Sequence, residues 1–213
     1  MLILESKDPD LYARVEEKNL IRQYDLLTNS IELGLKQGPT SFDKYLLWAL
    51  NHTAVANISQ FGGRFREEPI YVGNHIPPHF REVPDLMDRC ISFVHENWHL
   101  TPTQLGAYIL WRLNWIHPFI EGNGRTARAA CYYLLCTRAG VMLPGRKIVP
   151  ERIRETRREY VDALRAADQA WANGSLDISK MEAYLARLLE AQLKDLDSNG
   201  GPEQPASRSS TVA

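Results

Sequence analysis

The spacing of apolar residues restricts the fold of this chain more than any other feature of its sequence. In residues 10–33, apolar side chains recur at intervals of three or four, and residues 150–170 and 176–195 are amphipathic in the same way. This period is typical of helices that bury one face in a shared core. We therefore predict an all-α protein built as a helical bundle.

Capping residues predict where the remaining helices begin and end. Ser41 is a candidate N-cap for a helix over 42–60, and Thr101 with Pro102 is a candidate start for a helix that ends near residue 116. The other expected helices run from Pro84 to about Trp98 and from within residues 122–125 to Gly140.

One segment departs from the helical pattern. Residues 62–78, GGRFREEPIYVGNHIPP, place Phe65, Ile70 and Val72 between glycines and prolines, which predicts a short β-hairpin. We expect three regions in all: an N-terminal helical region over 1–40, a main domain over 41–195, and a polar, disordered tail over 196–213.

Composition excludes several classes of protein. The 213 residues carry a formal net charge of -1, which gives no general affinity for nucleic acid. Three cysteines, an odd number without a CxxC pair, favour a reducing compartment over a disulfide framework. Because no signal-peptide core or membrane-length apolar run is found, we expect a soluble cytoplasmic protein with neither nucleic-acid nor membrane partners.

The stretch from His117 to Arg128, HPFIEGNGRTAR, gathers groups that act on phosphates. Pro118 disfavours helical geometry at His117, so the preceding helix should stop there and leave the imidazole at its end. Gly122 and Gly124 allow the backbone to approach a ligand closely, and the next helix starts among them. Unpaired amides at the start of a helix form a ready anion site.

Charged residues complete this stretch. Arg125 and Arg128 lie three positions apart on a helix, so both guanidiniums reach one face and suit more than one phosphate. Glu121 offers one carboxylate, and Mg²⁺ in phosphate sites takes one or two carboxylates together with phosphate oxygens and water. A base, a metal ligand and an anion loop in one segment predict attack on a polyphosphate.

This stretch resembles the signature of the Fic-domain family: His, any residue, Phe, any residue, Asp or Glu, Gly-Asn-Gly-Arg, two residues, Arg. Every fixed position is matched, and GRFREEPIYVG followed by IPP is similar to the family's flap hairpin. The resemblance covers residues 20–190. It implies a Fic fold and a protein adenylyltransferase, which uses Mg²⁺ and transfers AMP from ATP to a Ser, Thr or Tyr hydroxyl of a target protein.

The resemblance also implies a role for each residue of the motif. His117 would be the general base, and Glu121 would hold Mg²⁺. The backbone amides of the loop would cradle the α- and β-phosphates, while both arginines would hold the outer phosphates. The nucleotide-binding residues would be Gly122, Asn123, Gly124, Arg125 and Arg128, together with Asn173, which occupies the place where the family often contacts adenine.

The flap would present the target protein to this motif. The edge of a hairpin can pair with an extended segment of another protein through main-chain hydrogen bonds, whatever that segment's side chains. The candidate docking residues are Arg66, Glu67, Ile70, Tyr71 and Val72. A purely structural hairpin, with Ile70 and Val72 in the core, is the alternative.

Many Fic proteins carry an inhibitory helix with the pattern Ser or Thr, three residues, Glu, then Gly or Asn. Two stretches compete for it: TNSIEL, with Thr28 and Glu32 but Leu33 at the last position, and SFVHEN, residues 92–97, which fits fully. The first precedes the flap, as in the branch with an N-terminal inhibitory helix. We expect Glu32 to pair with Arg128 and to inhibit; a solvated helix glutamate is the alternative.

Other activities are open on the same fold. Removal of AMP, transfer of another nucleotide and phosphotransfer are alternatives, although the intact GNGR argues against phosphotransfer. A locked nucleotide-binding or interaction module is a further alternative. The sequence leaves the target protein undetermined and a homodimer open.

Overall fold

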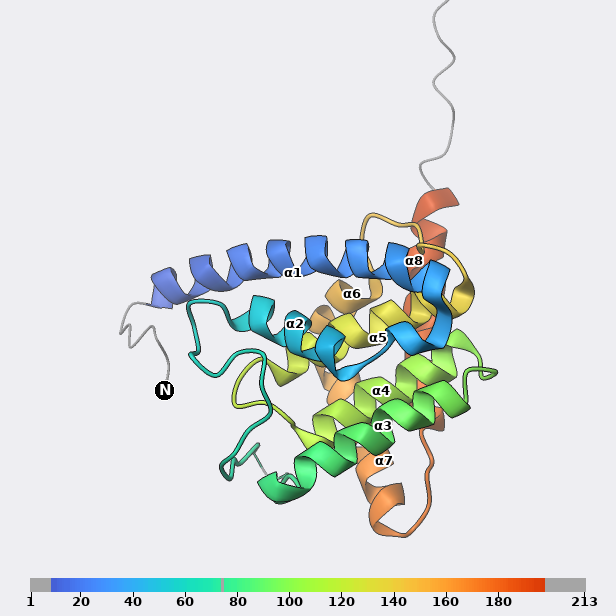
Figure 1. Ribbon diagram of the computed structural model, residues 1–213. Coiled ribbons are helices and arrows are strands. Elements are labelled where there is room, and N and C mark those ends of the chain that lie inside the picture. The colour runs from blue at the N-terminus through green and yellow to red at the C-terminus, as the bar shows by residue number, and fades with distance from the viewer. Residues whose placement is uncertain (1–8, 74, 198–213) are drawn as a thin grey trace, which may run out of the picture.

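The computed structural model describes residues 9–73 and 75–197, and the prediction of an all-α protein is confirmed. Most of the expected tail lies outside these residues. The helices, shown in Figure 1, are α1 (Pro9–Gln37), α2 (Lys44–Val55), α3 (Val83–Glu96), α4 (Pro102–Ile116), α5 (Asn123–Ala139), α6 (Val149–Glu155), α7 (Arg157–Ala172) and α8 (Ser179–Asp197), with 3₁₀ turns at Gly38–Ser41 and Phe80–Glu82.

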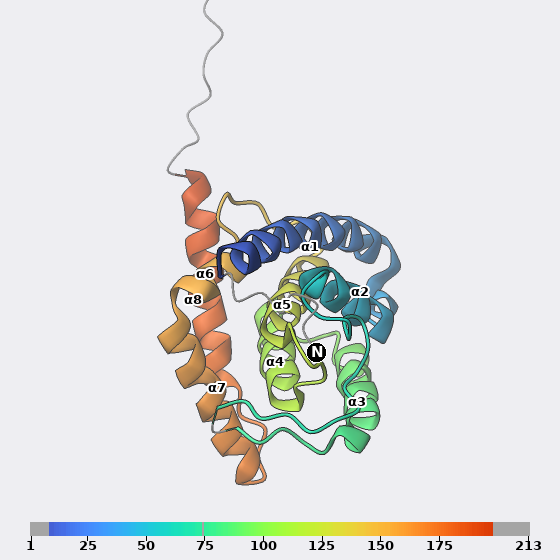
Figure 2. The same cartoon turned by 90° about the vertical axis from the view of Figure 1, so that its left-hand side faces the viewer.

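Helices α4 and α5 form the centre of the bundle. Helices α1 and α2 pack on α5, while α3, α7 and α8 pack around α4, as Figure 2 shows. A Cβ at Gly106 of α4 would lie only 3.2 Å from Leu135 and 3.3 Å from the Cys131 sulfur, so glycine at this position lets the two helices approach closely. The functional motif is the connection between these two central helices.

Of the two predicted N-caps, Thr101 is observed at the start of its helix and Ser41 is not. Thr101 caps α4 as expected, since its hydroxyl accepts from the Gln104 amide and the Gln104 side chain accepts from the Thr101 amide. The prediction that Ser41 caps the next helix is wrong. Ser41 ends a 3₁₀ turn, and Asp43 caps α2 by accepting from the Leu46 amide at 2.8 Å.

Helices α2 and α7 also differ from the predicted ranges. Helix α2 ends at Val55 because Asn57 adopts a left-handed backbone with a φ of 60°, which no helix continues. The predicted helix over 150–170 is divided at Thr156 into α6 and α7. The Thr156 hydroxyl bonds to the Arg152 carbonyl at 2.8 Å and to the Tyr184 hydroxyl at 2.7 Å, which ties this break to α8.

The predicted hairpin over 62–78 does not form a ladder. Its described residues contain one antiparallel bridge, in which Val72 and His75 exchange backbone hydrogen bonds of 3.3 and 2.9 Å. Three prolines in the segment lack amide donors, so a longer ladder is not available. In the same described part of the chain, no helix has the length and apolar character needed to cross a membrane.

Candidate active site

The histidine of the motif lies at the end of α4 in an unusual backbone conformation. His117 is the C-cap of this helix, with φ 52° and ψ 61°, where a non-glycine residue is uncommon. Pro118 follows it, as the sequence predicted for the end of this helix. The guanidinium of Arg66 donates to the His117 carbonyl at 2.8 Å, and the Arg66 amide donates to the Pro118 carbonyl at 2.8 Å. These bonds hold the chain in the conformation that exposes the imidazole to the motif.

The imidazole of His117 is neutral and has one free nitrogen. Its Nδ1 lies 3.2 Å from the Asn114 carbonyl oxygen, which can only accept, so Nδ1 carries the proton and Nε2 keeps its lone pair. Burial lowers the pKa of His117 to about 4; the bond to Asn114 opposes this shift, and the charges of His75 and Arg66 add to it. At neutral pH this side chain is therefore a base.

The loop after His117 leads directly into the amino end of α5. Gly122 has a φ of 79°, and a Cβ there would lie 2.5 Å from a methyl group of Val55, so only glycine fits. The side chain of Asn123 is buried and braces the loop, because it donates to the Phe119 carbonyl at 2.7 Å and accepts from the Phe119 amide at 2.9 Å. The amides of α5's first turn thus open onto the hollow beside His117.

The two arginines of the motif have different partners. Arg125 donates to the Glu121 carboxylate at 3.0 Å and to the Ala54 carbonyl at 3.0 Å, and it forms an ion pair with Glu16 of α1 at 3.2 Å. Arg128 has neither a hydrogen bond nor an ion pair with any residue of 9–73 or 75–197. Burial lowers its pKa. Arg128 is therefore a free guanidinium facing the same hollow.

Glu121 supplies the one carboxylate of the motif. Its Oε1 accepts from the Gly122 amide at 3.1 Å and from Arg125 at 3.0 Å. Among the residues that the structure describes, no group of three or more His, Cys, Asp or Glu side chains is placed to hold a metal ion by itself. A single carboxylate beside an anion loop suits Mg²⁺ that takes its other ligands from phosphates and water.

A carboxylate from α1 enters the site, but it is not the one that the sequence indicated. Tyr12 and Glu16 line a hollow of about 300 Å³ together with the motif. Glu32 is exposed, lies about 24 Å farther along the helix axis, and makes no ion pair with Arg128 in the described structure. The hydroxyl of Thr28 is used within the helix, where it donates to the Tyr24 carbonyl at 3.0 Å. The prediction for Thr28 and Glu32 thus needs correction.

The sequence around Glu16 matches the inhibitory-helix pattern loosely, but not at every position. In YARVEE, a hydroxyl side chain stands four positions before the glutamate, as in the inhibitory pattern, but it is Tyr12 rather than Ser or Thr. The next residue, Glu17, replaces Gly or Asn. Since positions four apart share a helix face, Tyr12 and Glu16 reach the hollow together.

The flap residues divide into buried and exposed groups. Arg66 is 3% exposed and donates to the carbonyls of Glu68, Pro78 and Ile116 in addition to that of His117, so it is a clamp within the fold and not a docking residue. Tyr71 is 82% exposed and Glu67 is also exposed. Ile70 and Val72 are half-buried. Asn173 is the exposed C-cap of α7 and does not line the hollow.

Asn51 of α2 is a site residue that no sequence pattern singles out. Its buried amide donates to the Glu121 carbonyl at 2.8 Å and to the Thr126 hydroxyl at 3.2 Å, and its oxygen accepts from the Gly63 amide at 3.0 Å. One side chain thus joins α2, the anion loop and the start of the flap. An asparagine inside an amphipathic helix carries no sequence signal for such a long-range role.

Comparisons with known proteins agree with this geometry. Residues 41–135 match the family model described as Fic/DOC family. The protein adenylyltransferase Fic of Drosophila persimilis is 32% identical over 185 residues, which cover 84% of this chain and 33% of that protein. The one from Drosophila melanogaster is 31% identical over the same length, 34% of its chain. This chain therefore spans about a third of the length of these relatives.

Solved structures share the fold. Fic-1 of C. elegans, residues 134–508, superposes with a TM-score of 0.66 at 22% identity, over 86% of this chain and 50% of the other. A Fic domain containing signaling protein of Bacteroides thetaiotaomicron gives 0.61 at 22% identity, over 81% and 70%.

Proposed function

We propose that this chain is a member of the Fic/DOC family, whose model matches residues 41–135, and that it transfers AMP from ATP to a hydroxyl group of a target protein. One observation carries the proposal. The neutral imidazole of His117, the open amides of α5 and the arginines of the motif line one hollow. This is the set of groups that attack on a nucleotide phosphate needs.

His117 acts as the general base. As the hydroxyl oxygen of the target attacks the α-phosphorus of ATP, Nε2 of His117 accepts the hydroxyl proton, the bond to the bridging oxygen breaks and pyrophosphate leaves. The bond from Nδ1 to the Asn114 carbonyl supports this role, because it fixes the tautomer in which Nε2 accepts. The low pKa of His117 supports it as well, because the base is then already unprotonated at neutral pH.

The loop and the arginines bind the phosphates. The amides of Asn123 and Gly124 take the inner phosphates together with that of Gly122, which must first leave the Glu121 carboxylate, and Arg125 and Arg128 take the outer phosphates. Glu121 would hold Mg²⁺, which neutralises phosphate charge when it is bound. Arg125 must break its ion pair with Glu16 before it can bind a phosphate, because its guanidinium is paired with two carboxylates, those of Glu16 and Glu121.

Glu16 therefore restrains the enzyme. Its carboxylate occupies the arginine side of the hollow that would receive phosphate, and it adds negative charge where an anion must bind. We assign the inhibitory role to Glu16 in place of Glu32. The same carboxylate favours a second candidate activity, the removal of AMP from a modified protein, because it lies in one hollow with His117 and is able to orient a water molecule.

The partner is a protein with an accessible Ser, Thr or Tyr. The exposed flap residues Glu67 and Tyr71, with Ile70 and Val72 beside them, would receive its extended segment. Cys90, Cys131 and Cys136 are buried free thiols, which supports a reducing compartment such as the cytoplasm.

The test is transfer of label to protein. Wild type, Glu16→Ala and His117→Ala are incubated with a cell lysate, Mg²⁺ and ATP labelled at the α-phosphate, and in parallel with ATP labelled at the γ-phosphate. We expect α-label on protein bands, strongest with Glu16→Ala and absent with His117→Ala, and no γ-label. Protein labelling from γ-labelled ATP alone would contradict AMP transfer and indicate phosphotransfer. Absence of both labels, while the purified proteins bind ATP, would also contradict it.

A further inference from the structure

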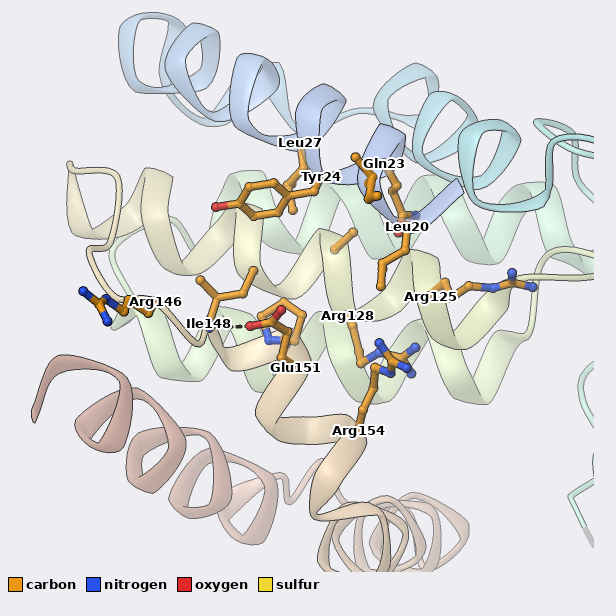
Figure 3. Close-up of a pocket in the computed structure, with 13 residues that line it drawn as sticks. Leu20, Gln23, Tyr24, Leu27, Arg125, Arg128, Arg146, Ile148, Glu151 and Arg154 are labelled. Atoms are coloured by element: carbon orange, nitrogen blue, oxygen red, sulfur yellow. Dashed lines mark hydrogen bonds between the residues drawn. The ribbon is translucent and has the colours of Figure 1, made fainter. Parts of the chain in front are cut away.

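A second hollow lies on the other side of the motif arginines. It has a volume of about 320 Å³ and is formed by α1, the start of α5 and the segment that leads into α6. Figure 3 shows this hollow, which we call the arginine groove. Its size falls within the range of ligand pockets, about 300–1,000 Å³. Its charged wall consists of four arginines and one glutamate, Arg125, Arg128, Arg146, Arg154 and Glu151.

Three of these arginines lack a counter-ion among the residues that the structure describes. Within residues 9–73 and 75–197, Arg128, Arg146 and Arg154 form no ion pair and no hydrogen bond. Their neighbour Arg152 is bound to Asp195 of α8, so a paired guanidinium is available for comparison in the same short helix. Glu151, the one acid of the groove, accepts from the Ile148 amide at the start of α6.

Arg128 and Arg154 approach each other across the groove. Their side chains extend toward one another in Figure 3, and, after burial, the charge of Arg154 contributes to lowering the pKa of Arg128. The charge of Glu16 acts on Arg128 in the opposite direction, but Glu16 forms no ion pair with it in the described structure. Two like charges in proximity that lack a paired carboxylate repel unless an anion binds both. A phosphate, with three oxygens and up to two charges, satisfies two guanidiniums better than a single carboxylate does.

The opposite wall of the groove is apolar. Leu20, Tyr24 and Leu27 of α1 lie across from Ile148 in Figure 3. Ala129 of α5 also lines the groove. Tyr24 is 46% exposed and Leu20 is 36% exposed, so these two side chains are only partly covered by the protein itself, whereas Leu27 and Ile148 are buried behind them. An inorganic anion would leave this apolar surface exposed to water, whereas a ligand with an apolar or aromatic body would bury it.

We propose that the arginine groove binds an organic phosphate, with the phosphate between Arg128 and Arg154 and an apolar or aromatic body along the partly exposed side chains of Leu20 and Tyr24. The groove shares Arg125 and Arg128 with the hollow of His117, so its ligand competes with the outer phosphates of ATP for Arg128, whereas Arg154 and Tyr24 line the groove and not the hollow. A nucleotide and an aliphatic phosphate ester have this chemistry in common. The proposal concerns binding alone and does not require AMP transfer.

Isothermal titration of the full chain with three probes tests it: hexyl phosphate, ADP and inorganic phosphate. We expect hexyl phosphate or ADP to bind at least about tenfold more tightly than inorganic phosphate, because of the apolar wall. Arg154→Gln should weaken the organic probes about tenfold or more. Tyr24→Ala should weaken the organic probes while it leaves inorganic phosphate unchanged.

Two variants control for general effects. Arg157→Gln removes an exposed charge of α7 that lines no part of the groove, and it should bind like wild type. Arg154→Lys keeps the charge and should bind with intermediate affinity. A preference for ADP that Arg154→Gln abolishes identifies a nucleotide, and a preference for hexyl phosphate that Arg154→Gln abolishes identifies an aliphatic ester. Equal affinities in wild type and Arg154→Gln, or no gain of either organic probe over inorganic phosphate, would overturn the proposal.

Discussion

The carboxylate of Glu16 lies 3.2 Å from a guanidinium nitrogen of Arg125, so α1 supplies a partner to an arginine of the phosphate-binding motif. Arg125 is mostly buried, with 11% of its side chain exposed, while Glu16 has 47% exposed. The same guanidinium also binds Glu121 and a backbone carbonyl, so Glu16 is one of three acceptors that compete with a phosphate.

Replacing this carboxylate should raise activity. We expect Glu16→Ala to increase the rate of AMP transfer roughly tenfold, which corresponds to about 1.4 kcal/mol and to the strength of a charge-assisted contact at a partly buried site. Glu32→Ala is the matched control on the same helix and should leave the rate unchanged. The measurement is initial rate of α-label incorporation. A rise with Glu32→Ala and none with Glu16→Ala would return the inhibitory role to Glu32.

The pH dependence of transfer should reveal the buried histidine. Neutral His117 is the active base, so activity is complete above its pKa and falls as pH decreases through it. Since that pKa is lowered to about 4, protonation of His117 should not reduce kcat/KM between pH 8 and pH 6. A histidine with an ordinary pKa near 6.5 would lose more than half of its activity as a base over the same range. The profile of kcat/KM in Glu16→Ala measures this. A midpoint near 6.5 would contradict the buried, neutral base.

The same shift affects stability at low pH. The unfolded chain binds this proton near pH 6.5 and the folded chain only near 4, so the unfolding free energy should decrease as pH falls between these values. His117→Gln cannot take up the proton and should lose less stability over that range. Urea titrations of both proteins at pH 7 and pH 5 give the comparison. An equal loss in both would argue against the shift.

Asn51 should matter for stability and for catalysis together. Asn51→Ala leaves the Gly63 amide and the Glu121 carbonyl without their partner, and we expect a loss of about 2–3 kcal/mol in unfolding free energy. Transfer should fall too, because the anion loop loses its tie to α2. Asn29→Ala, at an exposed position of α1, is the control. Wild-type stability in Asn51→Ala would show that this network contributes little.

Catalysis should require the planar, multiply donating guanidinium of Arg66 and not only its positive charge. Arg66→Lys keeps a positive charge but cannot reach the four carbonyls that the guanidinium binds, so we expect kcat to fall about tenfold or more while KM for ATP changes little. Arg64→Lys, at an exposed neighbouring position, should behave like wild type. Full activity of Arg66→Lys would refute the clamp.

The sequence predicted the parts of this protein whose causes are local. The helix stop at His117, the glycine turn at Gly122 and the two arginines of α5 follow from residues within one short stretch, and the structure places them in one hollow. Thr101 was predicted for the same reason, because a capping box needs only four neighbouring residues.

The parts that sequence reasoning missed depend on distant contacts. Glu16, Asn51 and Arg66 reach the motif from segments far away in the chain. Nothing in the neighbourhood of Asn51 distinguishes it from a core residue, Glu16 matches the inhibitory pattern only loosely, and the position of Arg66 in the flap suggested docking and not a contact with His117. The Ser41 error has a more local cause. Ser41 belongs to a 3₁₀ turn, and Asp43, two residues later and not predicted, caps the helix.

The Arg66 clamp has a consequence for how this site can be studied. In the described part of the chain, its guanidinium binds only carbonyl oxygens of the main chain, so these bonds do not depend on which side chain stands at 78, 116 or 117. His117→Ala removes the imidazole but keeps the backbone carbonyl to which Arg66 donates. The flap and the anion loop should therefore keep their positions in that variant, which separates the loss of the base from any loss of target or nucleotide binding.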